Sequence, residues 1–289
     1  MKIATWQWGG TRACGLVSAD GREVTPLALD PSERPLGGLA LLLRQAEGLP
    51  LPQPTGPRLP VSAVELEAPI PRPRRNLFCV GRNYRAHAQE LSSTVFKDND
   101  AKEDGWPIVF TKLPECVVAT GSTVRLPLEV SSQIDYEAEL AVIIGRGGRN
   151  IPAARALQHV WGYTIVNDVT ARDVQMRHQQ WDLGKSFDTF CPMGPWMVSA
   201  DECDGTDTRL RSWVNGELRQ DASTRDLIFD IPTLIETCSR GITLYPGDII
   251  ATGTPAGVGM GMEPPVYLKP GDVMRIEIAG IGTLENDFQ

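Results

Sequence analysis

Two glutamates in residues 134–144, IDYEAELAVII, have the spacing that places side chains on one face of a β-strand. β-Branched and aromatic residues without Pro or Gly predict a strand there. Its alternation points Glu137 and Glu139 to the same side as Ala141 and Ile143. Two such carboxylates repel each other and resist burial unless a positive group lies between them. An oxygen-binding divalent cation would supply that charge, and a strand end whose glutamates face water is the open alternative.

A third carboxylate, Asp168, follows a predicted buried strand at 162–166. A helix is expected from Thr170 onward, because a capping-box pattern with Asp in place of Glu begins there. Strand ends of this kind are where sheets with helices hold ligands. With Glu137 and Glu139, Asp168 would form an all-oxygen site that selects Mg²⁺, Mn²⁺ or Ca²⁺ over zinc. Taken alone, an aspartate here is also typical of a helix start or a turn.

His87 and Glu90 form a His-x-x-Glu pair. On a helical turn these positions are neighbours, so Glu90 could orient the imidazole and let His87 act as a general base on water. The chain has only three histidines, which narrows the choice of base. The pair does not match the zinc motif H-E-x-x-H. A surface histidine beside a surface glutamate is the alternative.

Three further features could bind an anionic substrate. Lys185 lies beside a glycine and near aromatic residues, where it could meet a carboxylate or a developing oxyanion. Arg172 and Gln175 lie at i and i+3 on the expected helix, and Arg172 could clamp a carboxylate. Residues 252–259, TGTPAGVG, form a Gly-rich turn whose backbone N–H groups and hydroxyls could bind a carboxylate. A solvent-facing arginine and an ordinary tight turn are the alternatives.

The elements that must position these residues begin with a small β-rich unit at residues 1–70. Residues 13–17 and 23–27 resemble two short strands around an Asp-Gly turn, which is a hairpin signal. Residues 36–45 are apolar at helical spacing. Residues 50–60 are Pro-rich and indicate an extended linker.

Residues 71–289 alternate predicted strands and short helices, which indicates a second, larger domain. A strand is expected at 77–80 and a helix at 154–159. Pro-Gly pairs at 246–247 and 270–271 have the type II turn signature, and each precedes a predicted strand. The charged stretch Lys97–Asp104 cannot form a core, and it follows His87 closely enough to serve as a lid, although a plain surface loop is the simpler interpretation.

Bulk properties narrow the class of protein. At 289 residues, with 42% hydrophobic and 22% charged residues, the chain suits one large globular domain with or without a small one. Its net charge of −8 argues against nucleic-acid and anionic membrane partners. Six scattered cysteines without C-x-x-C spacing favour reduced thiols and a cytoplasmic location. We expect neither a signal peptide nor a transmembrane segment.

Taken together, these segments resemble the fumarylacetoacetate hydrolase family from about Leu77 to Asn286. Their order and spacing fit throughout, which makes the match more specific than any one motif. The segment before His87 carries no acid, unlike that of the animal fumarylacetoacetases, so the resemblance is to short bacterial-type members. The motifs are CVGRNYRAHAQE, FTK, DYEAELAVIIG, GYTIVNDVTARDVQ, GKSFDTFCPMGP, VNGE, LYPGDIIATGTPAGVG and GIGTLEN.

The resemblance implies an α+β fold, in which a mixed β-sheet is rolled into a barrel-like sandwich after a small β-rich N-terminal domain. It also implies a homodimer that uses Mg²⁺ or Mn²⁺. Its site residues map onto this sequence as metal ligands Glu137, Glu139 and Asp168, catalytic residues His87, Glu90 and Lys185, and substrate-binding residues Arg172, Gln175, Thr254 and Lys112.

The activity that we expect is metal-dependent hydrolysis of a C–C bond in a 2,4-dioxo acid, either an acylpyruvate or a diketo-deoxy sugar acid, to pyruvate and a second acid. The alternatives on the same fold are an oxaloacetate-type decarboxylase, an isomerase or a lyase of 2-oxo acids, because all of them exploit a stabilised enolate. A non-catalytic metabolite-binding protein is a remote alternative. The expected partner is a small 2-oxo acid.

Overall fold

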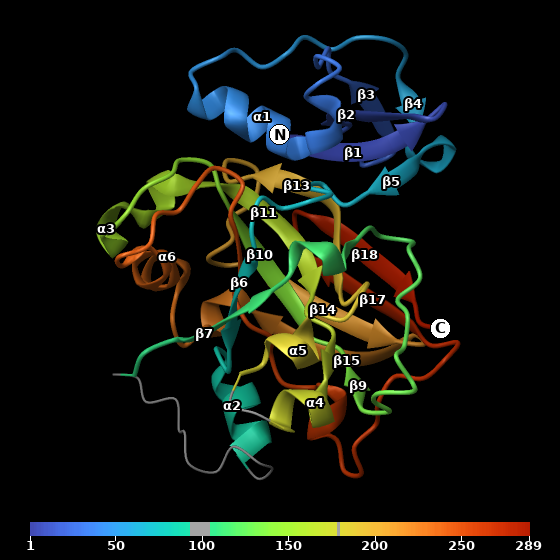
Figure 1. Cartoon of the computed structure of the whole chain (residues 1–289), viewed down its shortest axis with the longest axis vertical. Helices are drawn as coiled ribbons and strands as arrows, with labels where there is room; N and C mark the ends of the chain where they lie inside the picture. Colours follow the sequence, from blue (N-terminus) through green and yellow to red (C-terminus); the bar gives the residue numbers. More distant parts are fainter. Residues whose placement is uncertain (93–104, 178–179) are drawn as a thin grey trace.

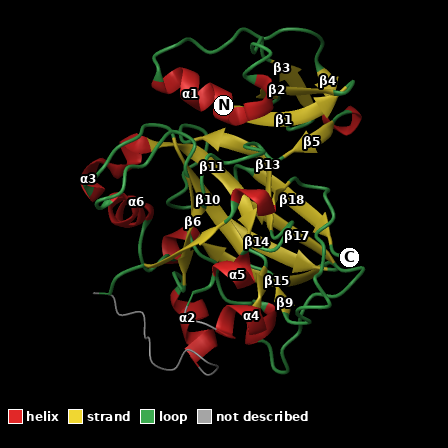
Figure 2. Cartoon of the chain, viewed as in Figure 1, coloured by secondary structure: helices red, strands yellow, loops and turns green. Residues whose placement is uncertain are grey.

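The computed structural model describes residues 1–92, 105–177 and 180–289, so the expected loop Lys97–Asp104 lies outside the described residues. Strands dominate, and they form a large mixed sheet, a four-stranded sheet and a small two-stranded pair (Figure 1). Helices lie around these sheets (Figure 2). None of the described helices is both long and apolar enough to cross a bilayer.

The N-terminal segment builds one end of the molecule (Figure 1). The predicted hairpin is present, with Leu16 opposite Thr25, and the predicted helix begins at Gly38. Lys2 pairs with Val198, so the N-terminal strands continue into the large sheet. The elements are β1 Lys2–Trp8, β2 Thr11–Val17, β3 Glu23–Pro26, α1 Gly38–Ala46, β4 Leu59–Pro60 and β5 Glu65–Glu67.

The large sheet has the strand order β4-β3-β2-β1-β13-β11-β10-β16-β6-β7, with β5 beside β1 and β8 beside β13. Two of its pairs, β16 with β6 and β13 with β8, are parallel, and its other described pairs are antiparallel. Its remaining strands are β6 Leu77–Gly81, β7 Ile108–Lys112, β8 Val117–Val118, β10 Ala138–Ile144, β11 Val160–Asn167, β13 Cys191–Ser199 and β16 Ile249–Ala251.

The second sheet has the order β15-β14-β17-β18 and consists of β14 Arg209–Val214, β15 Glu217–Ser223, β17 Val273–Ile278 and β18 Gly282–Asp287. The helices are α2 Arg85–Ser92, α3 Ala153–Ala156, α4 Arg172–Arg177, α5 Asp182–Lys185 and α6 Ile231–Ser239. Short 3₁₀ helices are η1 Arg34–Leu36, η2 Val61–Ala63, η3 Pro114–Cys116, η4 Leu157–His159, η5 Thr224–Asp226 and η6 Gly259–Gly261.

Strand β10 is buried along its whole length because both of its faces are covered. Leu140 and Val142 pack into the core between the large sheet and the four-stranded sheet, together with residues of β14, β17 and β18. Ala141 and Ile143 face the other way, into the core that includes α1. The α+β class is therefore confirmed and its form is a sandwich, since the described part of the large sheet ends at edge strands and does not close into a barrel.

Two local predictions were wrong. Residues 134–144 do not form one strand, because Tyr136 and Glu137 separate β9 (Ile134–Asp135) from β10. Thr170 does not cap a helix, because it belongs to β12 (Thr170–Ala171), which pairs with β9, and its hydroxyl donates to the carbonyl oxygen of Asp168 at 2.9 Å. Helix α4 therefore begins only after β12.

Candidate active site

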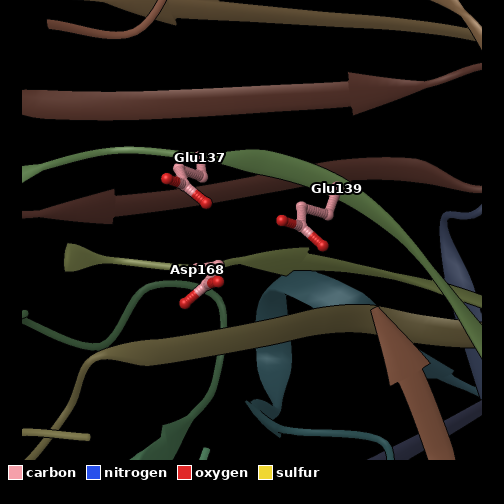
Figure 3. Close-up of side chains that lie close together, drawn as sticks. All are labelled: Glu137, Glu139 and Asp168. Atoms are coloured by element: carbon pink, nitrogen blue, oxygen red, sulfur yellow. The ribbon is translucent and has the colours of Figure 1, made fainter. Parts of the chain in front are cut away.

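The antiparallel pairing of β10 with β11 brings the three predicted metal ligands together. Glu139 lies opposite Val166. Two residues after Val166, the Asp168 amide donates to the Glu137 carbonyl at 2.9 Å. Glu137 and Glu139 therefore share a face, with Asp168 directly across from Glu137 (Figure 3). One carboxylate oxygen from each residue lies within 4.8 Å of the others, and all three residues are buried. These distances suit a single cation between them.

Buried cations neutralise part of this cluster. The Lys185 Nζ lies 2.9 Å from Glu137 Oε2 and 2.8 Å from Asp168 Oδ2. A guanidinium nitrogen of Arg172 lies 2.6 Å from Glu137 Oε1, and its Nε donates to Asp135 Oδ2 at 2.8 Å. Glu137, Asp168 and Asp135 therefore each meet a cationic donor, as buried charges require, whereas none of these cations is paired with Glu139 in the described part of the chain.

Lys112, predicted to bind substrate, lies behind Asp168. Its Nζ is 2.8 Å from Asp168 Oδ1 and donates to the carbonyl oxygens of Val169, at 3.1 Å, and Lys185. It is fully buried and is not among the described residues that line the pocket. From this position Lys112 is better placed to hold Asp168 than to contact a substrate.

The electrostatics of the cluster fit an additional cation. Burial opposes ionisation of Glu137, but Lys185 and Arg172 outweigh it and hold the pKa of Glu137 at about 2. Burial, together with Asp168 and Glu137, raises the pKa of Glu139 well above its ordinary value. Glu139 Oε2 accepts the Gly253 amide at 2.9 Å, whereas its Oε1 is buried without a hydrogen-bond partner in the described part of the chain. A divalent ion would satisfy that oxygen.

Opposite charges are closely matched in the described site. Three buried cations, Lys112, Arg172 and Lys185, lie among four buried carboxylates, Asp135, Glu137, Glu139 and Asp168, and a fourth buried cation, Arg82, lines the same pocket. The donor set, all carboxylate oxygen, is the type that holds Mg²⁺ or Mn²⁺.

The His87–Glu90 dyad is formed as its spacing predicts. His87 is buried in α2, and its Nδ1 lies 3.1 Å from Glu90 Oε2. The other oxygen of Glu90 accepts the Gly257 amide at 2.9 Å, so the carboxylate is fixed at both ends. A carboxylate that holds Nδ1–H leaves Nε2 as the basic nitrogen.

One small pocket gathers most of the predicted residues. Phe110 and Trp181 form an aromatic wall in edge-to-face contact, with ring centroids 5.2 Å apart, and the Lys185 Nζ lies 4.9 Å from the Phe110 ring centroid. The polar lining includes His87, Glu137, Arg172, Gln175, Lys185 and Thr254. A base, cations and one of the metal-type acids, Glu137, therefore line one buried space.

The Gly-rich turn at 252–259 has a role that its sequence did not reveal. Its amides were expected to bind a carboxylate, but three of them, and the Met260 amide that follows the turn, hold the protein's own acids. The donors are Gly253 N to Glu139 at 2.9 Å, Gly257 N to Glu90 at 2.9 Å, and Gly259 N and Met260 N to Asp135 at 2.7 and 3.0 Å.

Sequence reasoning missed at least three polar residues of the site, of which Arg82 is buried and lines the pocket. Asp135 is fully buried between Arg172 and the backbone of Gly259, and its alternation with Glu137 was a usable signal. Asn83 is also buried, and its Nδ2 donates to the Thr252 carbonyl at 2.8 Å. Nothing in its local pattern predicted that contact across the chain.

An acid, a histidine and a lysine that line one buried pocket are typical of an enzyme active site. Residues 76–289 match the family described as fumarylacetoacetate (FAA) hydrolase C-terminal. The chain belongs to this family, as its motifs predicted.

Named relatives differ in the reactions that they catalyse. The chain is 52% identical over 229 residues to oxaloacetate tautomerase YisK of Bacillus subtilis, and the aligned region covers 79% of this chain and 74% of the relative. It resembles a fumarylacetoacetate hydrolase structure from Exiguobacterium antarcticum with a TM-score of 0.85 and 40% identity, covering 100% and 99% of the two chains. A 5-carboxymethyl-2-hydroxymuconate delta-isomerase structure from Mycobacterium smegmatis matches with a TM-score of 0.78 and 33% identity, covering 100% and 99%.

Proposed function

We propose that this enzyme is a metal-dependent tautomerase of a small 2-oxo diacid of the oxaloacetate type, which interconverts the keto and enol forms. The tautomerase and isomerase names of two relatives favour this alternative over C–C hydrolysis. The observation that carries the proposal is that His87 and Lys185 line one buried pocket with Glu137. A base and a cation on one pocket are what proton transfer next to a carbonyl requires.

The proposed reaction moves a single proton. A C–H bond next to the 2-oxo group breaks and an O–H bond forms on the 2-oxo oxygen. The C=O bond becomes a single bond, and the adjacent C–C bond becomes a C=C double bond. His87, oriented by Glu90, would remove the proton at carbon through Nε2. The ammonium of Lys185 would stabilise the negative charge on oxygen. No activated water is needed, which separates this reaction from hydrolysis.

Glu137, Glu139 and Asp168 would hold Mg²⁺ or Mn²⁺, and the bound ion would supply Lewis-acid charge that favours enolisation. Arg172, Gln175 and Thr254 would hold the carboxylates of the substrate from the pocket wall. Arg172 also forms an ion pair with Glu137, so it would fix the position of a metal ligand relative to a substrate carboxylate.

The test follows the ultraviolet absorbance of enol oxaloacetate in Mg²⁺ and in EDTA, with pyruvate formation measured in parallel. We expect enol loss faster than in buffer, dependent on Mg²⁺ and without stoichiometric pyruvate. An acylpyruvate panel tests the hydrolase reading, which the name of the Exiguobacterium structure supports. Mg²⁺-dependent pyruvate from an acylpyruvate, with oxaloacetate tautomerising at the buffer rate, would replace the proposal with C–C hydrolysis.

The homodimer and the cytoplasmic location stay predictions. Light scattering during size-exclusion chromatography measures the first, and a mass of 31.6 kDa, that of one chain, would contradict it.

A further inference from the structure

Gln220 is a fully buried amide inside the apolar core between the two large sheets. It belongs to β15, in the sheet that does not carry the acids. Its side chain forms hydrogen bonds with its own sheet, with the first residue of β10 and with the turn that follows β16. Its Nε2 donates to Thr254 Oγ1 at 2.7 Å and to the Pro255 carbonyl at 2.8 Å, and its Oε1 accepts from the Ala138 amide at 3.2 Å and from Ser212 Oγ at 2.9 Å.

The backbone partners fix the orientation of this amide. A backbone N–H only donates and a carbonyl only accepts, so Oε1 must face Ala138 and Nε2 must face Pro255. Thr254 Oγ1 therefore accepts from Nε2, and it donates its proton to the Ala138 carbonyl at 3.0 Å. Gln220, Thr254 and Ala138 form a closed polar triangle inside the core.

This triangle joins two walls of the pocket. Ala138 lies between Glu137 and Glu139, and Thr254 follows the residue whose amide holds Glu139. One side chain from the opposite sheet thus bridges the acids and the Thr254 turn, beside the direct hydrogen bond from Thr254 to Ala138. Such a buried, fully satisfied network is rigid, and the loss of one member leaves the others unpaired.

We propose that Gln220 is a positioning residue, which holds the Thr254 turn at the spacing that lets the pocket take a chelating carboxylate. The inference rests on the proposed function in that Thr254 is taken to contact the bound acid. It concerns the geometry of the turn rather than the metal ligands themselves.

The experiment uses Gln220→Glu, which keeps an acceptor facing Ala138 but cannot supply both donors that face Thr254 and Pro255. An ionised carboxylate has no donor, and a protonated one has a single O–H. Oxalate serves as the probe, and calorimetry measures Mg²⁺ binding and then oxalate binding to the Mg²⁺-loaded enzyme. We expect the Kd for oxalate to rise about tenfold and the Kd for Mg²⁺ to stay within about twofold. Ser212→Ala is the matched control, because it removes one buried bond to Gln220 but leaves the Thr254 side intact.

Amide hydrogen exchange over residues 252–260 gives a second readout that needs no ligand. Faster exchange there in Gln220→Glu, but not in Ser212→Ala, supports the inference. Equal loss of Mg²⁺ and oxalate affinity, or unchanged oxalate affinity and exchange, would overturn it. If wild-type enzyme binds Mg²⁺ but not oxalate, the proposed function loses its support, and exchange alone decides the role of Gln220. If Gln220→Glu does not fold, the apolar Gln220→Met is measured in the same way.

Discussion

Replacing Lys185 by methionine separates the charge of this side chain from its volume. The ammonium is buried between Glu137 and Asp168, at 2.9 and 2.8 Å. There it neutralises the same carboxylates that a metal ion would neutralise. Without it, one positive charge is lost beside Glu137 and Asp168, although Arg172 still contacts Glu137 and Lys112 still contacts Asp168. Removing one partner of a buried pair costs about 3–5 kcal/mol.

For a chain of 289 residues, a loss of about 4 kcal/mol at about 2 °C per kcal/mol lowers the Tm by roughly 8 °C in EDTA. In saturating Mg²⁺ the ion replaces the missing charge, so the deficit relative to wild type shrinks to less than roughly 3 °C. Lys185→Met should therefore gain more stability from Mg²⁺ than wild type does. It should also bind the ion more tightly, because no ammonium competes for Glu137 and Asp168.

The assay is thermal unfolding of both proteins in EDTA and across an Mg²⁺ titration, with calorimetry for the affinity. Lys269→Met, at an exposed position, controls for the loss of a lysine in general. The same Tm deficit with and without Mg²⁺ would refute the reasoning, since the ammonium and the ion would then serve different carboxylates. Tautomerase activity of Lys185→Met should fall even at full metal occupancy, because the cation beside the substrate oxygen is gone.

Two further predictions concern the base and the turn. His87→Ala should lower kcat for tautomerisation by about 10²–10⁴-fold while the Kd for Mg²⁺, from calorimetry, stays unchanged; near-native rates would remove His87 from the mechanism. Gly253→Ala should weaken Mg²⁺ binding and lower the Tm, because Gly253 has φ +104° and an added Cβ would lie 2.8 Å from that of Asn83, which displaces the amide that holds Glu139. Gly216→Ala, at φ +80° with open space around it, carries the backbone strain alone and should leave Mg²⁺ affinity intact.

Local sequence patterns predicted elements whose cause is local. The hairpin around Asp20-Gly21 and the turns at Gly247 and Gly271 follow from residues that adopt positive φ or tight turns, and each is present. The break inside 134–144 has a distant cause. Tyr136 Oη donates to the Gly257 carbonyl at 2.9 Å, and the Glu137 amide donates to Asn167 Oδ1 at 3.1 Å.

In the site, too, the relations that were predicted have local causes and those that were missed have distant ones. Alternation along a strand predicted that Glu137 and Glu139 share a face, and i,i+3 spacing predicted the His87–Glu90 pair, because both relations are set by neighbouring residues. The cross-strand position of Asp168 depends on the register of β10 with β11, which no short segment encodes. Gln220 was out of reach for the same reason, because its partners lie 34 and 82 residues away.

The amides of 253–260 link the dyad to the metal-type acids. The Gly253 amide favours the ionised form of Glu139. The hydrogen bonds to the acids offset part of the entropy that this Gly-rich segment loses on folding. Glu90 and Glu139 are held from the same turn, so a displacement of the turn moves the base and the metal site together. Because these four amides are already committed, we expect the carboxylates of a substrate to be bound by the metal, by the cations of the pocket and by Thr254. Under the proposed function, specificity for a 2-oxo diacid would depend on Arg172, Lys185 and the spacing that Gln220 is proposed to hold.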